Sequence, residues 1–216
     1  YSYYTYQCDS LMASPNGDKL WDSFLAEAVG KGLKGKQLYN AIPHRRMSAT
    51  IYKNYPQGKI TVTDFLLGQY YLYEDALNSQ EWNIESDSMK VVLGHECQKA
   101  TCSFRGRKWT AWFALDVPVS DGPLKFCGLP GLIMEVYDRG KQYYFCINGM
   151  QQVSATPITF GILDKDFKHF QKTDRKDFLL SKYRYLRNQN SINEASTGIS
   201  LGSVDEALKY DLIEKE

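Results

Sequence analysis

Alternating apolar and polar residues joined by short turns constrain the fold of this chain more than any other feature. The stretch KVVLGHECQKATCSFRGRKWTAWF at 90–113 predicts a long strand to Phe104, a turn at 105–107 and a return strand. The stretches at 48–65 and 131–150 repeat the pattern of strand, short turn and strand. Strands connected by such short turns pair antiparallel. The sequence therefore predicts an antiparallel sheet, and 16 tyrosines among 216 residues are typical of a β-rich fold.

Two amphipathic stretches predict helices. In the first, Asp18 is the expected N-cap, and the core face is formed by residues at i, i+3, i+4 and i+7: Trp21, Phe24, Leu25 and Ala28. In the second, at roughly 173–189, Leu179, Tyr183 and Leu186 form an apolar face that covers the sheet or its edge.

These elements predict one α+β, β-rich domain over 1–216. Its core is a curved antiparallel sheet, half-barrel-like, at roughly 48–160, with a few covering helices.

The charge balance excludes one class of partner. Lys plus Arg number 26 and Asp plus Glu number 25, whereas a nucleic-acid binder normally carries a basic excess. No apolar run reaches the roughly 20 residues that a membrane-spanning helix needs. The first residue is Tyr1 rather than Met, so we expect that a targeting segment has been removed.

No constellation of residues predicts catalysis or metal binding. His95, Cys97 and Cys102 lie within eight residues, but structural zinc usually needs four ligands and no second closely spaced pair exists. Cys97 and Cys102 on one strand would lie too far apart for a disulfide. Carboxylates such as Glu74 and Asp75 are expected on a solvated face. The sequence thus predicts no catalytic residue, metal or cofactor.

One basic and aromatic stretch is the candidate binding site. SFRGRKWTAWF places Arg105, Arg107 and Lys108 beside Trp109 and Trp112. Bidentate arginines and aromatic stacking suit an anionic or sugar-like ligand. The alternative is a hairpin turn with basic residues at its tip and aromatic side chains packed beneath.

The hexapeptide GLPGLI at 128–133 predicts a bend. Gly128 and Gly131 permit positive φ or close backbone approach, and Pro130 pushes Leu129 toward extended geometry. None of these side chains can transfer a proton or attack a carbonyl. We interpret the motif, from Gly128 through Leu132 and Ile133, as a structural loop that leads into a strand.

Around this hexapeptide the chain resembles the GLPGLI family of Bacteroidota. The matching blocks are YKNYPQGKIT at 52–61, LGHECQKATCSFRGRKWTAWF at 93–113, PVSDGPLKFCGLPGLI at 118–133 and YDLIEKE at 210–216. The resemblance implies an exported protein of the periplasm or cell envelope that begins with a signal peptide. It also implies a genetic association with outer-membrane β-barrels or TonB-dependent receptors. The family has no established catalytic residues, and it usually has Tyr where this chain has His95.

We therefore expect a non-catalytic, exported cell-envelope protein that binds a partner or ligand, as an accessory to an outer-membrane receptor or barrel. One alternative is a hydrolase-type enzyme. Another is a periplasmic carrier of an apolar ligand, which requires an open concave sheet face.

Overall fold

The computed structural model describes residues 17–34, 37–38, 41, 49–152, 169–197 and 212–215. The chain divides into two compact units, Tyr1–Ala49 and Thr50–Glu216, and each is described by itself. The prediction of a single domain remains a prediction. In the described part of the chain, no helix is both long enough and apolar enough to cross a membrane.

Helix α1 (Gly17–Gly30) is the described element of the first unit, where the sequence predicted a helix. Ala28 is buried on its core face, and Phe24 and Leu25 are half-buried. Asp18 lies inside the helix, so its prediction as N-cap was wrong. The helix ends where Gly32, at φ +73°, donates its N–H to Val29 O and Leu33 donates to Ala28 O. These two bonds form a Schellman motif, which satisfies carbonyls in the last turn.

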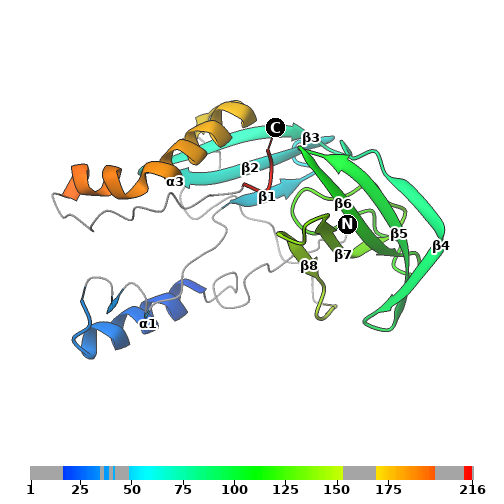
Figure 1. Ribbon diagram of the computed structural model, residues 1–216, viewed down its shortest axis with the longest axis horizontal. Helices are drawn as coiled ribbons and strands as arrows, with labels where there is room; N and C mark the ends of the chain where they lie inside the picture. The colour runs from blue at the N-terminus through cyan, green and yellow to red at the C-terminus, as the bar shows by residue number, and fades with distance from the viewer. Residues whose placement is uncertain are drawn as a thin grey trace. The chain divides into compact units, whose positions relative to one another are not determined.

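Strands dominate the second unit and form two sheets (Figure 1). The four-stranded sheet has the order β1-β2-β3-β9. Its strands are β1 (Thr50–Lys53), β2 (Lys59–Leu66), β3 (Gln69–Ala76) and β9 (Gln171–Lys172). β1, β2 and β3 pair antiparallel, and β9 runs parallel to β3.

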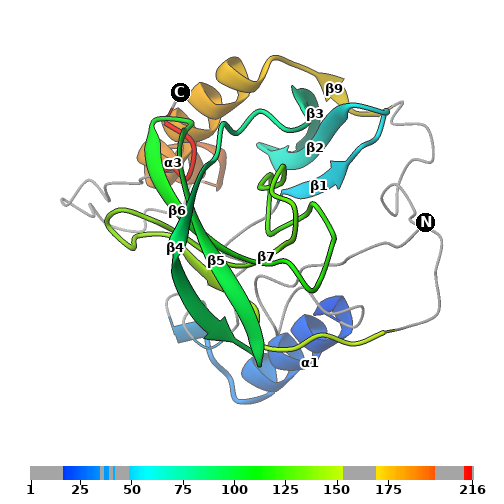
Figure 2. The same cartoon turned by 90° about the vertical axis from the view of Figure 1, so that its right-hand side faces the viewer.

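The five-stranded sheet is antiparallel throughout, with the order β4-β5-β6-β7-β8. Figure 2 shows its strands β4, β5, β6 and β7. Its strands are β4 (Asn83–Val92), β5 (His95–Phe104), β6 (Arg107–Ala114), β7 (Leu132–Asp138) and β8 (Tyr144–Cys146). The β-rich, antiparallel fold with few helices is thereby confirmed. The strands are divided between two sheets, and neither closes on itself among the described residues.

Three hairpin turns have the same two-residue geometry. Leu67-Gly68, Leu93-Gly94 and Arg105-Gly106 each hold both residues at positive φ, with values between 49° and 83°. Such pairs match the type I′ turn, whose twist fits the flanking strands. The turn at Leu93-Gly94 divides the long strand that the sequence predicted up to Phe104 into β4 and β5. Leucine rarely adopts positive φ, so the pattern gave no warning of this turn.

Aromatic side chains fill the core of the five-stranded sheet. Phe126, which is 2% exposed, contacts the rings of Trp82, Phe104 and Trp109, with centroids 6.3, 6.1 and 4.6 Å away. Phe113 is fully buried in the same cluster. Phe126 precedes the hexapeptide, so the loop that carries the motif is anchored directly in the core.

Helix α3 (Arg175–Thr197) packs on β3, which confirms the predicted covering helix. Phe178 is 3% exposed and contacts the rings of Tyr71 and Tyr73. Tyr183, predicted on the covering face, is 38% exposed. The helix continues past the predicted end near 189, across a non-helical Asn188.

The loop at 121–131 is held by hydrogen bonds to its main chain. Lys53 Nζ donates to Asp121 Oδ1 at 2.5 Å, Gly122 O at 2.5 Å and Phe126 O at 2.8 Å. Burial lowers the pKa of Lys53, and the negative charge of Asp121 opposes that shift. Trp82 Nε1 donates to Cys127 O at 2.8 Å. The loop's polar backbone groups are thereby satisfied without regular secondary structure.

The predicted interpretation of the hexapeptide as a bend before a strand agrees with the structure, because β7 begins at Leu132. Gly128 has φ +90° and donates its N–H to Ser120 Oγ at 3.1 Å. At Gly131 an added Cβ would lie 2.0 Å from Ala114 O, a distance that real Cβ atoms do not reach. Leu129 and Ile133 are buried on either side of this contact.

We predict that Gly131→Ala destabilises the protein by at least about 3 kcal/mol, because the backbone of the β6 end must move. Gly149→Ala is the matched control, since nothing lies within 4 Å of its added Cβ, and we expect a change within about 0.5 kcal/mol. Urea unfolding followed by circular dichroism measures both. Equal stability of the two variants would contradict the close approach at Gly131.

Candidate functional site

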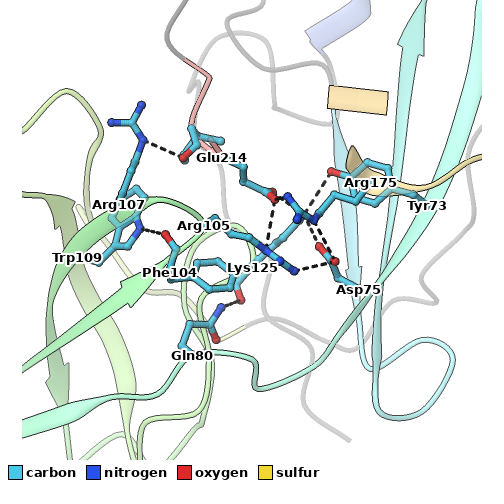
Figure 3. A network of polar contacts seen from close by, with 11 residues as sticks. Tyr73, Asp75, Gln80, Phe104, Arg105, Arg107, Trp109, Lys125, Arg175 and Glu214 are labelled. Carbon is cyan, nitrogen blue, oxygen red and sulfur yellow. Dashed lines mark hydrogen bonds and ion pairs between the residues drawn. The ribbon is translucent and has the colours of Figure 1, made fainter. Parts of the chain in front are cut away.

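Five charged side chains from distant parts of the chain converge at one buried point (Figure 3). Asp75 comes from β3, Arg105 from the β5–β6 turn, Lys125 from the 121–131 loop, Arg175 from the first residue of α3 and Glu214 from segment 212–215. We call these five residues the charge cluster. It joins strands of both sheets, a helix and two irregular segments.

Lys125 lies at the centre of the charge cluster. Its Nζ is 2.6 Å from Asp75 Oδ2, 2.5 Å from Glu214 Oε1 and 3.3 Å from the hydroxyl of Tyr73. Gln80 Nε2 donates to the main-chain oxygen of Lys125 at 3.0 Å, which fixes the backbone below the ammonium group. Burial and the nearby negative charges of Glu214 and Asp75 raise the pKa of Tyr73, so it remains a neutral phenol.

Two arginines complete the charge cluster. Arg105 Nη2 is 2.9 Å from Asp75 Oδ1, and Arg175 Nη1 is 3.2 Å from Glu214 Oε2. Arg175 Nε is 3.6 Å from Asp75 Oδ1, and Arg105 Nε is 3.7 Å from Glu214 Oε2. Each carboxylate therefore faces three cations, and four of the five side chains are no more than 10% exposed. Charges this deeply buried are tolerated only when they compensate one another.

Arg107 holds segment 212–215 beside the charge cluster. Its Nε donates to Ile213 O at 2.9 Å and its Nη2 donates to Leu212 O at 2.8 Å. Its Nη1 pairs with Asp138 Oδ2 at 2.9 Å, which orients the guanidinium group. On the other side of Glu214, Lys215 donates its N–H to Arg105 O at 3.1 Å. The segment is thus bound through main chain and side chain together.

The four residues predicted as a binding patch do not meet on one surface. Arg105 and Arg107 contact segment 212–215 and its neighbours, as described above. Trp109 is 2% exposed in the core and donates Nε1 to Phe104 O at 3.1 Å. Trp112 lies on the other face of β6, with Lys90 Nζ 4.8 Å from its ring centroid. The ligand-binding role of these residues remains a prediction, and the contacts of the two arginines are intramolecular.

Sequence reasoning missed most of the charge cluster. Asp75 was expected on a solvated face, but its side chain is 9% exposed among cations. Lys125, Arg175 and Glu214 carried no local signal, because their partners lie 39 to 109 positions away along the chain. The basic turn at 105–107 was the one stretch of the site that drew attention.

The thiols and histidine of β5 form a different environment. His95 Nδ1 is 2.7 Å from Asp116 Oδ2 in a partly exposed pair. Cys97, Cys102 and Cys127 are buried free thiols, and burial raises their pKa values, that of Cys102 to about 12. Within the described ranges, no three His, Cys, Asp or Glu side chains are placed to hold a metal ion.

Strand β4 forms an edge of the five-stranded sheet and carries exposed apolar side chains. The exposed fractions are 42% for Ile84, 52% for Met89 and 67% for Val91, and Leu93 in the following turn is 47% exposed. The pairing with β5 is interrupted by a bulge between Glu85 and Met89. An edge strand with apolar side chains is a surface to which another strand can add.

Comparison with known proteins adds a family match to a short part of the chain. Residues 105–135 match the model of a family described as a protein of unknown function, Porph_ging. This segment contains Arg105, Arg107, Lys125 and the hexapeptide. No curated protein matches the chain.

Two solved structures are similar to part of the chain, and both are structures of PNGF-II. The one in space group P21 is 17% identical with a TM-score of 0.38, and it covers 57% of this chain and 22% of that one. The one in space group C2 is 18% identical with a TM-score of 0.36, and it covers 58% and 23%. The chain thus spans less than a quarter of the length of PNGF-II in either structure. Similarity at this level carries no argument here about fold or function.

We predict that Asp75→Asn destabilises the protein by about 3 kcal/mol or more, whereas Lys125→Met costs about 1–2 kcal/mol. In Asp75→Asn, the three cations of the charge cluster would share one described carboxylate, that of Glu214. In Lys125→Met, both carboxylates remain and each still faces two arginines. Urea unfolding of both variants measures the difference. A greater loss for Lys125→Met would show that the cations do not depend on Asp75.

We predict that the buried thiols are unreactive in the folded protein. In a Cys8→Ser background at pH 8, Ellman's reagent should modify the exposed Cys146 quickly, and Cys97, Cys102 and Cys127 at least about 100-fold more slowly. The additional Cys146→Ser substitution should remove the fast phase, and guanidinium should expose all the remaining thiols. A fast phase of more than one thiol would contradict the burial described here.

Proposed function

We propose that this protein is a non-catalytic, exported protein of the cell envelope that binds a protein partner along strand β4. The observation that carries the proposal is the exposed apolar edge formed by Ile84, Met89, Val91 and Leu93. An added strand gains main-chain hydrogen bonds, and apolar side chains of the edge add specificity. The proposed partner is an outer-membrane β-barrel or TonB-dependent receptor.

The resemblance to the GLPGLI family supports the envelope location in this proposal. The hexapeptide lies within residues 105–135, the segment that matches an uncharacterised family model. Members of the GLPGLI family are expected to be exported and to associate with outer-membrane proteins. The Porph_ging family is itself described as a protein of unknown function, so the match supports no particular activity.

The interior of the five-stranded sheet favours binding over the two alternatives. An apolar-ligand carrier needs an open sheet face. In this protein, Trp109, Phe113 and Phe126 fill the core-facing side of the five-stranded sheet. A cysteine-dependent hydrolase needs an activated thiol, and the raised pKa values of Cys97, Cys102 and Cys127 make these thiols poor nucleophiles.

The proposal predicts site-specific cross-linking to one outer-membrane protein. A photoreactive amino acid at Val91 should capture the same β-barrel or receptor repeatedly in intact cells of the producing bacterium. The matched control carries the probe at Ser103, an exposed position on the inner strand β5, and should capture it at least tenfold less. Captured proteins are identified by mass spectrometry.

A second variant separates edge binding from general stickiness. Val91→Glu places a charge at a position that is 67% exposed, so we expect the unfolding free energy to change by less than about 0.5 kcal/mol. Cross-linking from a probe at Met89 should fall at least tenfold in this variant. Equal capture from Val91 and Ser103, or recovery of the protein from the cytosol, would contradict the proposal.

A further inference from the structure

The charge cluster and Arg107 together have the properties of a peptide-binding site. We propose that Arg105, Arg107, Lys125 and Arg175 form a site for a peptide that bends at an aliphatic residue and continues with glutamate. The chain's own segment 212–215 is then an occupant that a partner's segment of the same chemistry can replace. This inference does not depend on the β4 edge or on the proposed cellular location.

Main-chain recognition is the first part of the argument. Arg107 donates to two consecutive carbonyls, Leu212 O at 2.8 Å and Ile213 O at 2.9 Å. Lys215 returns a main-chain bond to Arg105 O at 3.1 Å. These three bonds use groups that every peptide carries, and they hold the chain in a bend at Ile213. They supply affinity without selecting a sequence.

Side-chain recognition supplies the selectivity. Ile213 packs against the hydrophobic core cluster that contains Phe126 and Trp109. The next residue, Glu214, places its carboxylate 2.5 Å from Lys125 Nζ and 3.2 Å from Arg175 Nη1. Buried groups of the site therefore contact both the apolar side chain at the position of Ile213 and the carboxylate at the position of Glu214. Charge-assisted hydrogen bonds of this kind are stronger than neutral ones.

One donor in the site is not used by the resident segment. Arg105 Nε is buried and finds no hydrogen-bond acceptor in the described structure, although Glu214 Oε2 lies 3.7 Å away. A peptide whose carboxylate approaches Arg105 more closely would gain a bond that the chain's own segment lacks. The resident segment compensates through its covalent connection, which gives it a high effective concentration.

The test measures binding of a free peptide to a variant of the whole chain in which segment 212–215 has lost its side-chain contacts with the site. The probe is a fluorescent heptapeptide with the sequence of residues 210–216, YDLIEKE. Fluorescence anisotropy should show at least tenfold tighter binding to the Ile213→Ser/Glu214→Gln variant than to the unaltered chain. The peptide with Gln in place of the glutamate that corresponds to Glu214, YDLIQKE, should bind at least tenfold more weakly, and adding Arg107→Met to the variant should weaken binding equally. Equal binding to the variant and the unaltered chain, or equal binding of the two peptides, would overturn the proposal.

Hydrogen exchange of the unaltered protein tests the proposal even if the double variant does not fold. A replaceable segment must leave the site without global unfolding, so amides of 212–215 should exchange at least tenfold faster than those of β6, which is paired on both sides. Protection of 212–215 equal to that of β6 would mean that the segment is a fixed part of the core, and would overturn the proposal.

Discussion

The mutual compensation of buried charges in the charge cluster is the constraint on which the second unit depends. Asp75 belongs to the four-stranded sheet, and Arg105 belongs to the turn between two strands of the five-stranded sheet. Lys125 and Glu214 reach the same point from irregular segments. A buried charge without its partner is costly, so the loss of one member of the charge cluster destabilises the positions of the others. Electrostatics thereby couples elements of both sheets, a helix and two irregular segments.

The loop at 121–131 makes this coupling possible because it fixes the backbone of Lys125. Lys53 donates to three oxygen atoms of the loop, and Gln80 donates to the carbonyl of Lys125 itself. At the far end, Gly131 allows the chain to pass against the Ala114 carbonyl and enter β7. The hexapeptide thus sets the path of the backbone, and Lys125, which precedes it in the same loop, contributes the charge.

Local patterns in the sequence predicted local structure well. The 105–107 turn, the covering helix at α3 and the bend at 128–131 all follow from periodicity or from glycine and proline, whose effects act within a few residues. The division between β4 and β5 was missed because Leu93 adopts a positive φ that leucine rarely shows. The partition into two sheets was missed because β3 and β4, although consecutive in the chain, belong to different sheets, and no local pattern indicates this.

The charge cluster illustrates the same limit in chemical terms. Arg105 and Arg107 were recognisable as candidates because two arginines flank a turn. Their contacts could not be predicted, since Asp75, Lys125 and Glu214 are ordinary charged residues until the fold removes water from them. Trp109 and Trp112 looked like one aromatic patch, but the alternation of a strand sends them to opposite faces.

The position of Glu214 in the chain has a consequence for the order of folding during synthesis. The ribosome adds Glu214 139 positions after Asp75 and 39 positions after Arg175. Until it emerges, Asp75 is the one carboxylate of the cluster available to Lys125, Arg105 and Arg175. Domains generally fold from the N-terminal side as they are synthesised, so the strands can pair before the cluster is complete. The nascent chain therefore passes through a stage in which its sheets exist but the electrostatic connection between them is unfinished.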